Sequence, residues 1–457
     1  MTETSPPPPL RSAAYVALLI LMLTYMVSYI DRMALGVLQE QIKAELDLSD
    51  WQLGLLSGPA FALLYSVMGL PIARLAERSG RTMVLAASLA VWSAMTMLCG
   101  LARNYTQLLL ARAGVSIGEA GCNPAAHSLI ADLFPPQERG RAIAFYSLGA
   151  PLGALLGAIT AGWLAHHWGW RTAFLMLGPP GFILAIVILF FMPKPPRGQF
   201  DATAVGSSPP FSAAPPLFRA VLKAFFGDPA LRQLAAGSAL IVLVGYGVAA
   251  FLPSFLVRRH GLDLESVGVL SGIINGAGAA VGTLASGFII DRFGGKDGRY
   301  YAWFPAIMVA GAVPCFVIGF LTNSLALSTV LLTLATTAIY TYIAPVFAQL
   351  HNILHTRMRA TGTSIMYLVL NLVGLGLGPP LIGLISDHMT RLAVAGVLEQ
   401  GRTSGCSGSA ASLPICQQAA GTGLSHALVI ISLILVVAVA HFWRAGRLIG
   451  ERSSSCP

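Results

Sequence analysis

Runs of about twenty apolar residues follow one another along almost the whole chain. An α-helix rises about 1.5 Å per residue, so a run of this length crosses the hydrocarbon core of a bilayer. A lipid-facing β-barrel would instead show alternating strands of about ten residues. The sequence therefore predicts an all-α integral membrane protein with twelve transmembrane helices. The twelve runs lie at residues 13–36, 51–74, 82–101, 105–133, 140–165, 171–192, 232–257, 265–290, 301–321, 325–350, 360–385 and 422–443.

The charge balance supports a membrane protein and indicates its orientation. Of the 457 residues, 55% are hydrophobic and only 10% are charged, against about 25% charged in soluble proteins. Most Lys and Arg fall in segments that face the cytoplasm if both termini are inside, as the positive-inside rule requires. We therefore expect a multi-pass protein of the cell inner membrane with both termini cytoplasmic. The same basic loops account for the net charge of +9, so no nucleic-acid partner is expected.

A polar, proline-rich stretch at residues 193–231 divides the chain. Its composition is typical of a linker, and its end, Leu217 to Phe226, alternates basic and apolar residues as a helix at a membrane surface does. We predict an N-terminal six-helix bundle at 1–192, a cytoplasmic linker with a short amphipathic helix at 193–231, and a C-terminal six-helix bundle at 232–457. The chain is expected to act as a monomer.

The two halves of the chain repeat each other. The segment Leu56-Ser57-Gly58 recurs 214 positions later as Leu270-Ser271-Gly272, and the same offset places Glu77-Arg78 on Asp291-Arg292. An acid followed by an arginine thus occupies the turn after the second helix of each half. Parallel six-helix repeats are one architecture of secondary transporters, so we expect two repeats of six helices.

Several motifs carry a family resemblance. Residues 287–294 read Gly-x-x-x-Asp-Arg-x-Gly, residues 73–81 are a weaker copy, and residues 149–157 form a Gly/Pro-rich helix segment. In these features the chain resembles the major facilitator superfamily. Within it, Tyr29-Ile30-Asp31-Arg32 and the run from Arg112 through Glu119 to Phe134 are similar to the spinster group.

The resemblance implies the major facilitator fold over all twelve spans and transport by alternating access. For the spinster group it implies proton-linked movement of lysophospholipids or sphingoid phosphates, and the chain looks like a bacterial member. The implied partners are protons, a lipid-like small molecule and membrane lipid. One departure is Ser28, where the group usually has Asn.

Two of the nineteen carboxylates, Asp31 and Glu119, lie deep inside apolar runs. Ionisable groups at membrane depth are costly and by default mark a pathway for protons, ions or substrate. Arg112 precedes Glu119 by seven residues, about two helical turns, so both side chains share one helix face. We predict that Asp31, Arg112 and Glu119 couple transport to protons. The alternative is a static ion pair that fixes helix packing.

The remaining cavity candidates are polar side chains at membrane depth. Arg32 points about 100° away from Asp31 on the helix and either lines the cavity or reaches toward the interface. The second half has no carboxylate inside its spans, and its polar residues are expected to form a neutral wall for an amphipathic ligand. Alternatively, each makes a helix–helix hydrogen bond. The predicted substrate cavity comprises Arg112, Arg32, Tyr29, Asn275, Tyr340, Tyr342, Tyr367 and Asn371.

The repeated acid and arginine motifs lie at helix ends and predict a cytoplasmic gate. An acid near a helix N-terminus is stabilised by the helix dipole, so such groups can clamp helices together and release them when the transporter opens. The alternative is that these charges only set topology. The gate residues are Glu77, Arg78, Arg81, Asp291 and Arg292.

Residues 387–421 form a long outer connection that contains Cys406 and Cys416. An oxidising exterior lets disulfides persist, so we predict a bridge between these two residues, the alternative being two free thiols. The chain has no Walker phosphate loop and no His-Glu-x-x-His zinc motif. We therefore expect no enzyme activity, no cofactor and no metal.

These observations predict a proton-coupled secondary transporter of amphipathic, anionic, lipid-like molecules. A proton-coupled exporter of drugs or small metabolites is the alternative from the same class. A membrane receptor or scaffold is the alternative from another class, and it would require a soluble docking domain. Every segment outside the apolar runs is too short for such a domain.

Overall fold

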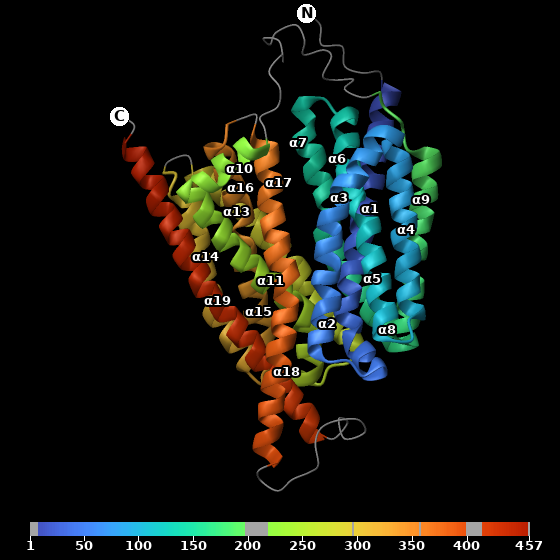
Figure 1. Cartoon of the computed structure of the whole chain (residues 1–457), viewed down its shortest axis with the longest axis vertical. Helices are drawn as coiled ribbons and strands as arrows, with labels where there is room; N and C mark the ends of the chain where they lie inside the picture. The colour runs from blue at the N-terminus through green and yellow to red at the C-terminus, as the bar shows by residue number, and fades with distance from the viewer. Residues whose placement is uncertain (1–7, 197–217, 295–296, 356–357, 399–413, 456–457) are drawn as a thin grey trace, which may run out of the picture. The chain divides into compact units, whose positions relative to one another are not determined.

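The computed structural model describes residues 8–196, 218–294, 297–355, 358–398 and 414–455, and every regular element in these ranges is a helix (Figure 1). The elements, with η marking π-helices, are α1 (Pro8–Leu46), α2 (Asp50–Ser57), α3 (Pro59–Ser79), α4 (Arg81–Leu101), α5 (Tyr105–Ala120), α6 (Cys122–Leu133), α7 (Pro136–Ser147), α8 (Gly149–Leu177), α9 (Pro179–Phe191), α10 (Phe218–Gly227), α11 (Pro229–His260), α12 (Leu264–Ser271), η2 (Gly272–Ala277), α13 (Gly278–Phe293), α14 (Tyr300–Leu321), α15 (Leu325–Tyr340), α16 (Ile343–Ile353), α17 (Arg359–Leu370), η4 (Asn371–Leu375), α18 (Gly376–Leu398) and α19 (Pro414–Ser455).

Among the described residues, ten helical stretches are long and apolar enough to cross a membrane. One of them, Glu138–Phe191, has 54 residues and is long enough to cross twice. Gly169 breaks it with a φ of 78°, a conformation that glycine adopts without steric cost. The span expected at 105–133 is shared between α5 and α6. The prediction of an all-α integral membrane protein is confirmed.

The chain forms two compact units. The first comprises residues 1–34 and 63–213, and the second comprises residues 35–62 and 214–457. Helices α1 and α3 therefore each belong to both units, because residues 35–62 pack with the C-terminal helices. The boundaries expected from the sequence, at 192 and 232, stay a prediction.

The short helix α10 lies where the sequence places an amphipathic helix. Its Val221 and Phe225 are buried, whereas Arg219 and Lys223 are exposed. This division of one helix into an apolar and a basic face suits a helix that lies at a membrane surface. Its position at the cytoplasmic surface stays a prediction.

Three spans in each half are interrupted at corresponding places. α2 ends before Gly58, and its repeat partner α12 passes into the π-helix η2 at Gly272. α5 and α15 both end after 16 residues, at Gly121 and Thr341. α7 and α17 both end after 12 residues. Matching interruptions in the two halves of a transporter point to its binding site, and π-helical turns also concentrate at functional sites.

Glycines on α8 let that helix approach α1 closely. A Cβ atom on Gly157 would lie 2.5 Å from the Cα atom of Ile30, and one on Gly153 would collide with the carbonyl oxygen of Met26. Small residues at four-residue spacing permit such backbone contacts between membrane helices. The contact ends one residue before Asp31, so it sets the position of the charged turn of α1.

Substitution of Gly157 by Val should destabilise the protein. The added side chain would push α8 away from Ile30, and such overpacking costs about 1–3 kcal/mol. Gly140→Val is the matched control, because a Cβ atom at Gly140 has no neighbour within 4 Å. Thermal unfolding of the two purified variants in the same detergent measures the difference. Equal melting temperatures would contradict the close approach of α8 and α1.

Candidate functional site

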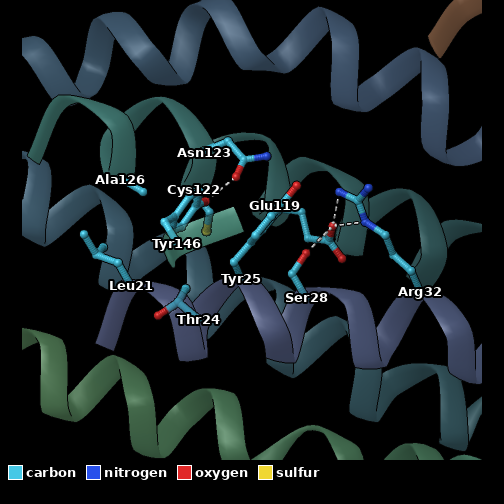
Figure 2. Close-up of a pocket in the computed structure, with 10 residues that line it drawn as sticks. All are labelled: Leu21, Thr24, Tyr25, Ser28, Arg32, Glu119, Cys122, Asn123, Ala126 and Tyr146. Carbon is cyan, nitrogen blue, oxygen red and sulfur yellow. Dashed lines mark hydrogen bonds and ion pairs between the residues drawn. The ribbon is translucent and has the colours of Figure 1, made fainter. Parts of the chain in front are cut away.

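A polar pocket lies in the first unit where α1, α5, α6 and α7 meet (Figure 2). Its cavity volume is about 10 Å³, roughly the space of one water molecule and far below the volume of about 300–1,000 Å³ of pockets that bury drug-sized ligands. A ligand larger than a water molecule would therefore enter only if the surrounding helices moved apart. Its lining side chains are Leu21, Thr24, Tyr25, Ser28, Arg32, Glu119, Cys122, Asn123, Ala126 and Tyr146.

Glu119 on α5 forms a buried ion pair with Arg32 on α1. Only 1% of the Glu119 side chain is exposed, against 17% for Arg32. The Oε2 atom of Glu119 accepts hydrogen bonds from Arg32 Nε at 2.8 Å and from Ser28 Oγ at 3.0 Å, and it lies 2.6 Å from a terminal guanidinium nitrogen (Figure 2). The Oε1 atom of Glu119 is buried without a hydrogen-bond partner. One carboxylate oxygen therefore carries the whole ion pair.

Two tyrosine rings flank the guanidinium group of Arg32. Its central carbon lies 5.1 Å from the ring centre of Tyr29 and 5.2 Å from that of Tyr65. Cations within about 6 Å of an aromatic face are attracted by the ring quadrupole. Arg32 is thus held by the charge of Glu119 and, independently, by two aromatic rings.

An asparagine joins the flanking tyrosines to the rest of the pocket. Asn123 on α6 donates from Nδ2 to the Tyr65 hydroxyl at 2.9 Å and accepts at Oδ1 from the Tyr146 hydroxyl at 2.5 Å. The Tyr146 ring stacks on Tyr25 with a centroid distance of 4.7 Å, and Tyr25 meets the edge of Tyr29 at 5.1 Å. With Arg32 between Tyr29 and Tyr65, these contacts close into a ring of six side chains, called here the tyrosine ring.

The break between α5 and α6 places Glu119 and Asn123 on the same wall. Asn104 begins α5 by accepting a hydrogen bond from the backbone N–H of Gln107, as helix-capping residues do. α5 ends at Gly121, where a Cβ atom would lie 2.6 Å from Ile72 and would collide with a serine side chain of α4. The backbone can turn at this tightly packed position because glycine has no side chain.

Asp31 lies beside Arg32 in sequence but has other partners. It is 2% exposed, and its Oδ2 atom accepts a hydrogen bond of 2.7 Å from the hydroxyl of Thr96 on α4. It also interacts electrostatically with Arg112 and Glu119. Like Glu119, it has one carboxylate oxygen, Oδ1, that is buried without a hydrogen bond. The first unit therefore holds two acids and two arginines in one buried electrostatic network.

Comparison with known proteins identifies the family. The model of the Major Facilitator Superfamily matches residues 21–398. The chain belongs to the Major Facilitator Superfamily. The structure is also similar to the crystal structure of a bacterial homologue of the human lysosomal transporter spinster in an inward-facing, unoccupied conformation. The TM-score is 0.84 and the identity 32%, over 97% of this chain and 98% of that chain.

Curated relatives cover several kinds of transporter. The chain is 34% identical to an MFS-type efflux pump of Mycolicibacterium smegmatis over 82% of this chain and 85% of the pump. It is 30% identical to a probable L-galactonate transporter of Escherichia coli over 60% of this chain and 61% of that protein. The resemblance to the superfamily and to its spinster group is confirmed, and with it the major facilitator fold. The chain is a multi-pass membrane transporter.

The structure gives the predicted coupling residues Asp31, Arg112 and Glu119 different partners. The sequence places Arg112 between both acids, but Glu119 forms its ion pair with Arg32, and Arg112 interacts electrostatically with Asp31. Of the residues expected in the cavity, Arg32 lines this pocket, whereas Tyr29 contacts Arg32 without lining it, and Arg112 does not line it. The roles of all these residues in coupling and binding stay predictions.

The cavity candidates of the second half all lie in the second unit. Asn275 and Asn371 are in the π-helices η2 and η4. Tyr340 and Tyr342 flank the interruption between α15 and α16, and Tyr367 is 51% exposed. None of these five lines the pocket of the first unit, so their role as a substrate wall stays a prediction.

Of the five predicted gate residues, the structure describes the side chains of Arg81 and Arg292. The side chains of Glu77, Arg78 and Asp291 lie outside the described residues, and Arg292 is exposed. Arg81 forms a salt bridge with Asp132 on α6 and donates to Ser128 Oγ at 3.1 Å and to a backbone carbonyl oxygen beyond α9 at 3.2 Å. The sequence analysis gave Asp132 no role, because it read that residue only as part of a family motif.

Of the two cysteines in the predicted disulfide, Cys416 lies within the described residues. Cys416 is disulfide-bonded, whereas Cys406 lies outside the described residues, so the pairing stays a prediction. In the part of the chain that the structure describes, no three His, Cys, Asp or Glu residues gather as metal ligands.

Sequence analysis missed a second charged cluster, which lies in the second unit. Asp50, at the start of α2, is 1% exposed and accepts four hydrogen bonds. They come from Lys43 at 2.5 Å, from two guanidinium nitrogens of Arg258 at 2.7 Å each, and from Ser386 at 2.6 Å. The same guanidinium group binds Glu40 at 2.8–3.1 Å. Arg258 thus pairs with two acids from the segment 35–62, and Lys43 supplies a second positive charge to Asp50.

Further bonds attach this segment to the C-terminal helices. The carboxylate of Asp387 on α18 accepts the backbone N–H groups of Asp50 and Trp51 at 3.0 and 2.9 Å. Gln39 donates to the Ala250 carbonyl oxygen at 2.8 Å and to a serine hydroxyl on α11 at 2.6 Å. The repeat of the two halves does not show which residues more than 200 positions apart touch each other, so the sequence patterns could not have revealed these contacts.

Arg258→Leu should lower the stability of the second unit. It removes the cation that the buried Asp50 shares with the partly exposed Glu40, and breaking a buried pair costs about 3–5 kcal/mol. Arg391→Leu is the control, because Arg391 is exposed. Thermal unfolding in detergent measures both, and equal melting temperatures would refute the stabilising role. Adding Asp50→Asn to Arg258→Leu should recover part of the loss, since one unpaired charge is then gone.

Proposed function

We propose that this transporter is a proton-coupled secondary active transporter that works by alternating access on an amphipathic, anionic, lipid-like substrate. The observation that carries the proposal is the Arg32–Glu119 ion pair beside the polar pocket. An ionisable pair at membrane depth is expensive, and such groups by default mark a pathway for protons, ions or substrate. We propose Glu119 and Asp31 as proton acceptors and Arg32 and Arg112 as their cationic partners.

The ion pair can act as a switch because Arg32 can bind either Glu119 or a substrate anion. When Glu119 is ionised, its carboxylate binds the guanidinium group of Arg32, which is then not available to a substrate anion. When Glu119 is protonated, the attraction weakens and Arg32 becomes available to a substrate anion. Arginine suits this exchange, since its planar guanidinium binds carboxylates and phosphates through two hydrogen bonds. Proton uptake and anion binding would then be coupled through a single side chain.

The substrate class rests on the pocket and on the spinster resemblance. Polar and aromatic side chains line the pocket and would suit a head group once the helices around it move apart, whereas an acyl chain would extend along the apolar helices outside it. The candidates Asn275, Tyr340, Tyr342, Tyr367 and Asn371 remain the proposed neutral wall. We also propose an inner-membrane protein with cytoplasmic termini that acts as a monomer, with Glu77, Arg78, Arg81, Asp291 and Arg292 at its cytoplasmic gate.

A second candidate function is transport of a small organic anion or a drug. The polarity of the pocket favours a small polar anion, and the relatives include a probable L-galactonate transporter and an efflux pump. Reconstituted protein separates the candidates. Gradient-driven uptake of a labelled lysophospholipid would support the first, and uptake of a sugar acid or a cationic dye without lysophospholipid transport would support the second.

Glu119→Gln should abolish the part of uptake that a proton gradient drives, because the amide cannot exchange a proton. Exchange of substrate across liposomes at equal pH should persist, since Arg32 is then available to the anion. Glu265→Gln, at an exposed acid on α12, is the matched control. Uptake of labelled substrate with and without a pH gradient checks this. Full gradient-driven uptake by Glu119→Gln would rule out Glu119 as the coupling group.

A further inference from the structure

We propose that Asn123 is a positioning residue that holds Arg32 in the pocket through Tyr65, whether or not Glu119 carries a charge. The inference rests on the proposed function, because it explains how Arg32 stays in place to bind a substrate anion. It concerns residues of the tyrosine ring, of which Tyr65 and Asn123 have no role in the sequence analysis.

Without the tyrosine ring, Arg32 would lose its fixed position whenever Glu119 became neutral. Arginine side chains have high rotamer entropy, and 17% of this one is exposed. Once Glu119 is protonated, its charge no longer fixes the guanidinium group. A binding site for an anion would then be lost at the moment when it is needed.

The aromatic contacts of Arg32 do not depend on the protonation of Glu119. Tyr29 and Tyr65 lie at 5.1 and 5.2 Å from the guanidinium carbon, and cation–π attraction strengthens when water is excluded. Tyr29 is on the same helix as Arg32, one turn away, so its position follows from α1. Tyr65 is on α3 and needs a separate anchor.

Asn123 supplies that anchor and connects it to a third helix. Its Nδ2 group donates to the Tyr65 hydroxyl at 2.9 Å. Its Oδ1 atom accepts a hydrogen bond of 2.5 Å from the Tyr146 hydroxyl on α7 (Figure 2). Both halves of the amide are used, so its orientation is set by two tyrosines. The position of the Tyr65 ring against Arg32 is therefore determined by α6 and α7.

Other titratable groups face this site and have to be separated from Glu119 in any test. His127 contacts the Tyr146 ring with a centroid distance of 5.4 Å. Those that interact electrostatically with Arg32 or Glu119 are Asp31, Cys122, Tyr25, Tyr65 and Tyr146. A measurement at one fixed pH, with Glu119 replaced by Gln to represent its neutral form, avoids their titration.

The first experiment needs no substrate. The full-length protein is treated with phenylglyoxal, an arginine reagent, and modification of Arg32 is followed by peptide mass spectrometry. In Glu119→Gln, Arg32 should react slowly because the tyrosines still hold it. Adding Tyr65→Phe or Asn123→Leu should raise the rate about fivefold, as expected for the loss of one hydrogen bond. Adding Tyr105→Phe is the control, since the buried hydroxyl of Tyr105 on α5 has no hydrogen-bond partner.

The second experiment measures the consequence for transport. With lysophosphatidylglycerol as the anionic probe, Asn123→Leu should raise the KM several-fold at acidic pH with little change in the maximal rate. At alkaline pH the KM should match that of the unmodified protein, because ionised Glu119 then holds Arg32. A residue that only stabilises the fold would change both conditions alike.

The outcomes separate this inference from the proposed function. An unchanged rate of Arg32 modification in Tyr65→Phe and Asn123→Leu overturns the positioning role, whatever transport does. Faster modification supports it, and a KM effect confined to acidic pH supports the anion-binding role as well. Faster modification with no effect on lysophosphatidylglycerol at either pH keeps the positioning role but rejects the proposed lipid substrate.

Discussion

A charge inside a membrane protein needs a partner of opposite sign, because the hydrocarbon offers no water to solvate it. The first unit meets this requirement with Arg32 and Glu119, and with Arg112 beside Asp31. The second unit holds a further set of paired charges near helix ends, with Arg258 between Asp50 and Glu40. These pairings hold together helices that apolar packing alone would leave free to slide.

The two charged clusters differ in how completely they are satisfied. Each carboxylate oxygen of Asp50 accepts two hydrogen bonds, and these bonds stabilise its ionised form. Glu119 and Asp31 each keep one buried oxygen without a hydrogen bond. Leaving such an acceptor unsatisfied costs free energy, so these two carboxylates are less completely stabilised than Asp50. The cluster around Asp50 is therefore suited to hold structure, and a change of state in the network around Glu119 is the function that we propose for it.

Interrupted helices and close glycine contacts give these clusters their geometry. The break at Gly121 puts Glu119 and Asn123 on one wall, and the glycines of α8 fix the turn of α1 that carries Asp31 and Arg32. The repeat of such interruptions in both halves follows from the internal duplication of the sequence. Helices that are already broken can bend at low cost, because few hydrogen bonds remain to be lost at the break.

Hydrophobic runs and short motifs are local properties of the chain, so the sequence was enough to predict the helices, the repeat, the family and two of the buried acids, Asp31 and Glu119. It also placed Arg32 and Tyr29 near the cavity. It did not determine which arginine meets which acid: Asp31 and Arg32 are neighbours, yet they point about 100° apart and meet different helices. Only the tertiary structure joined Arg258 to Asp50 and closed the tyrosine ring through Asn123. Such pairings depend on how helices distant in sequence pack together, and no local pattern records that packing.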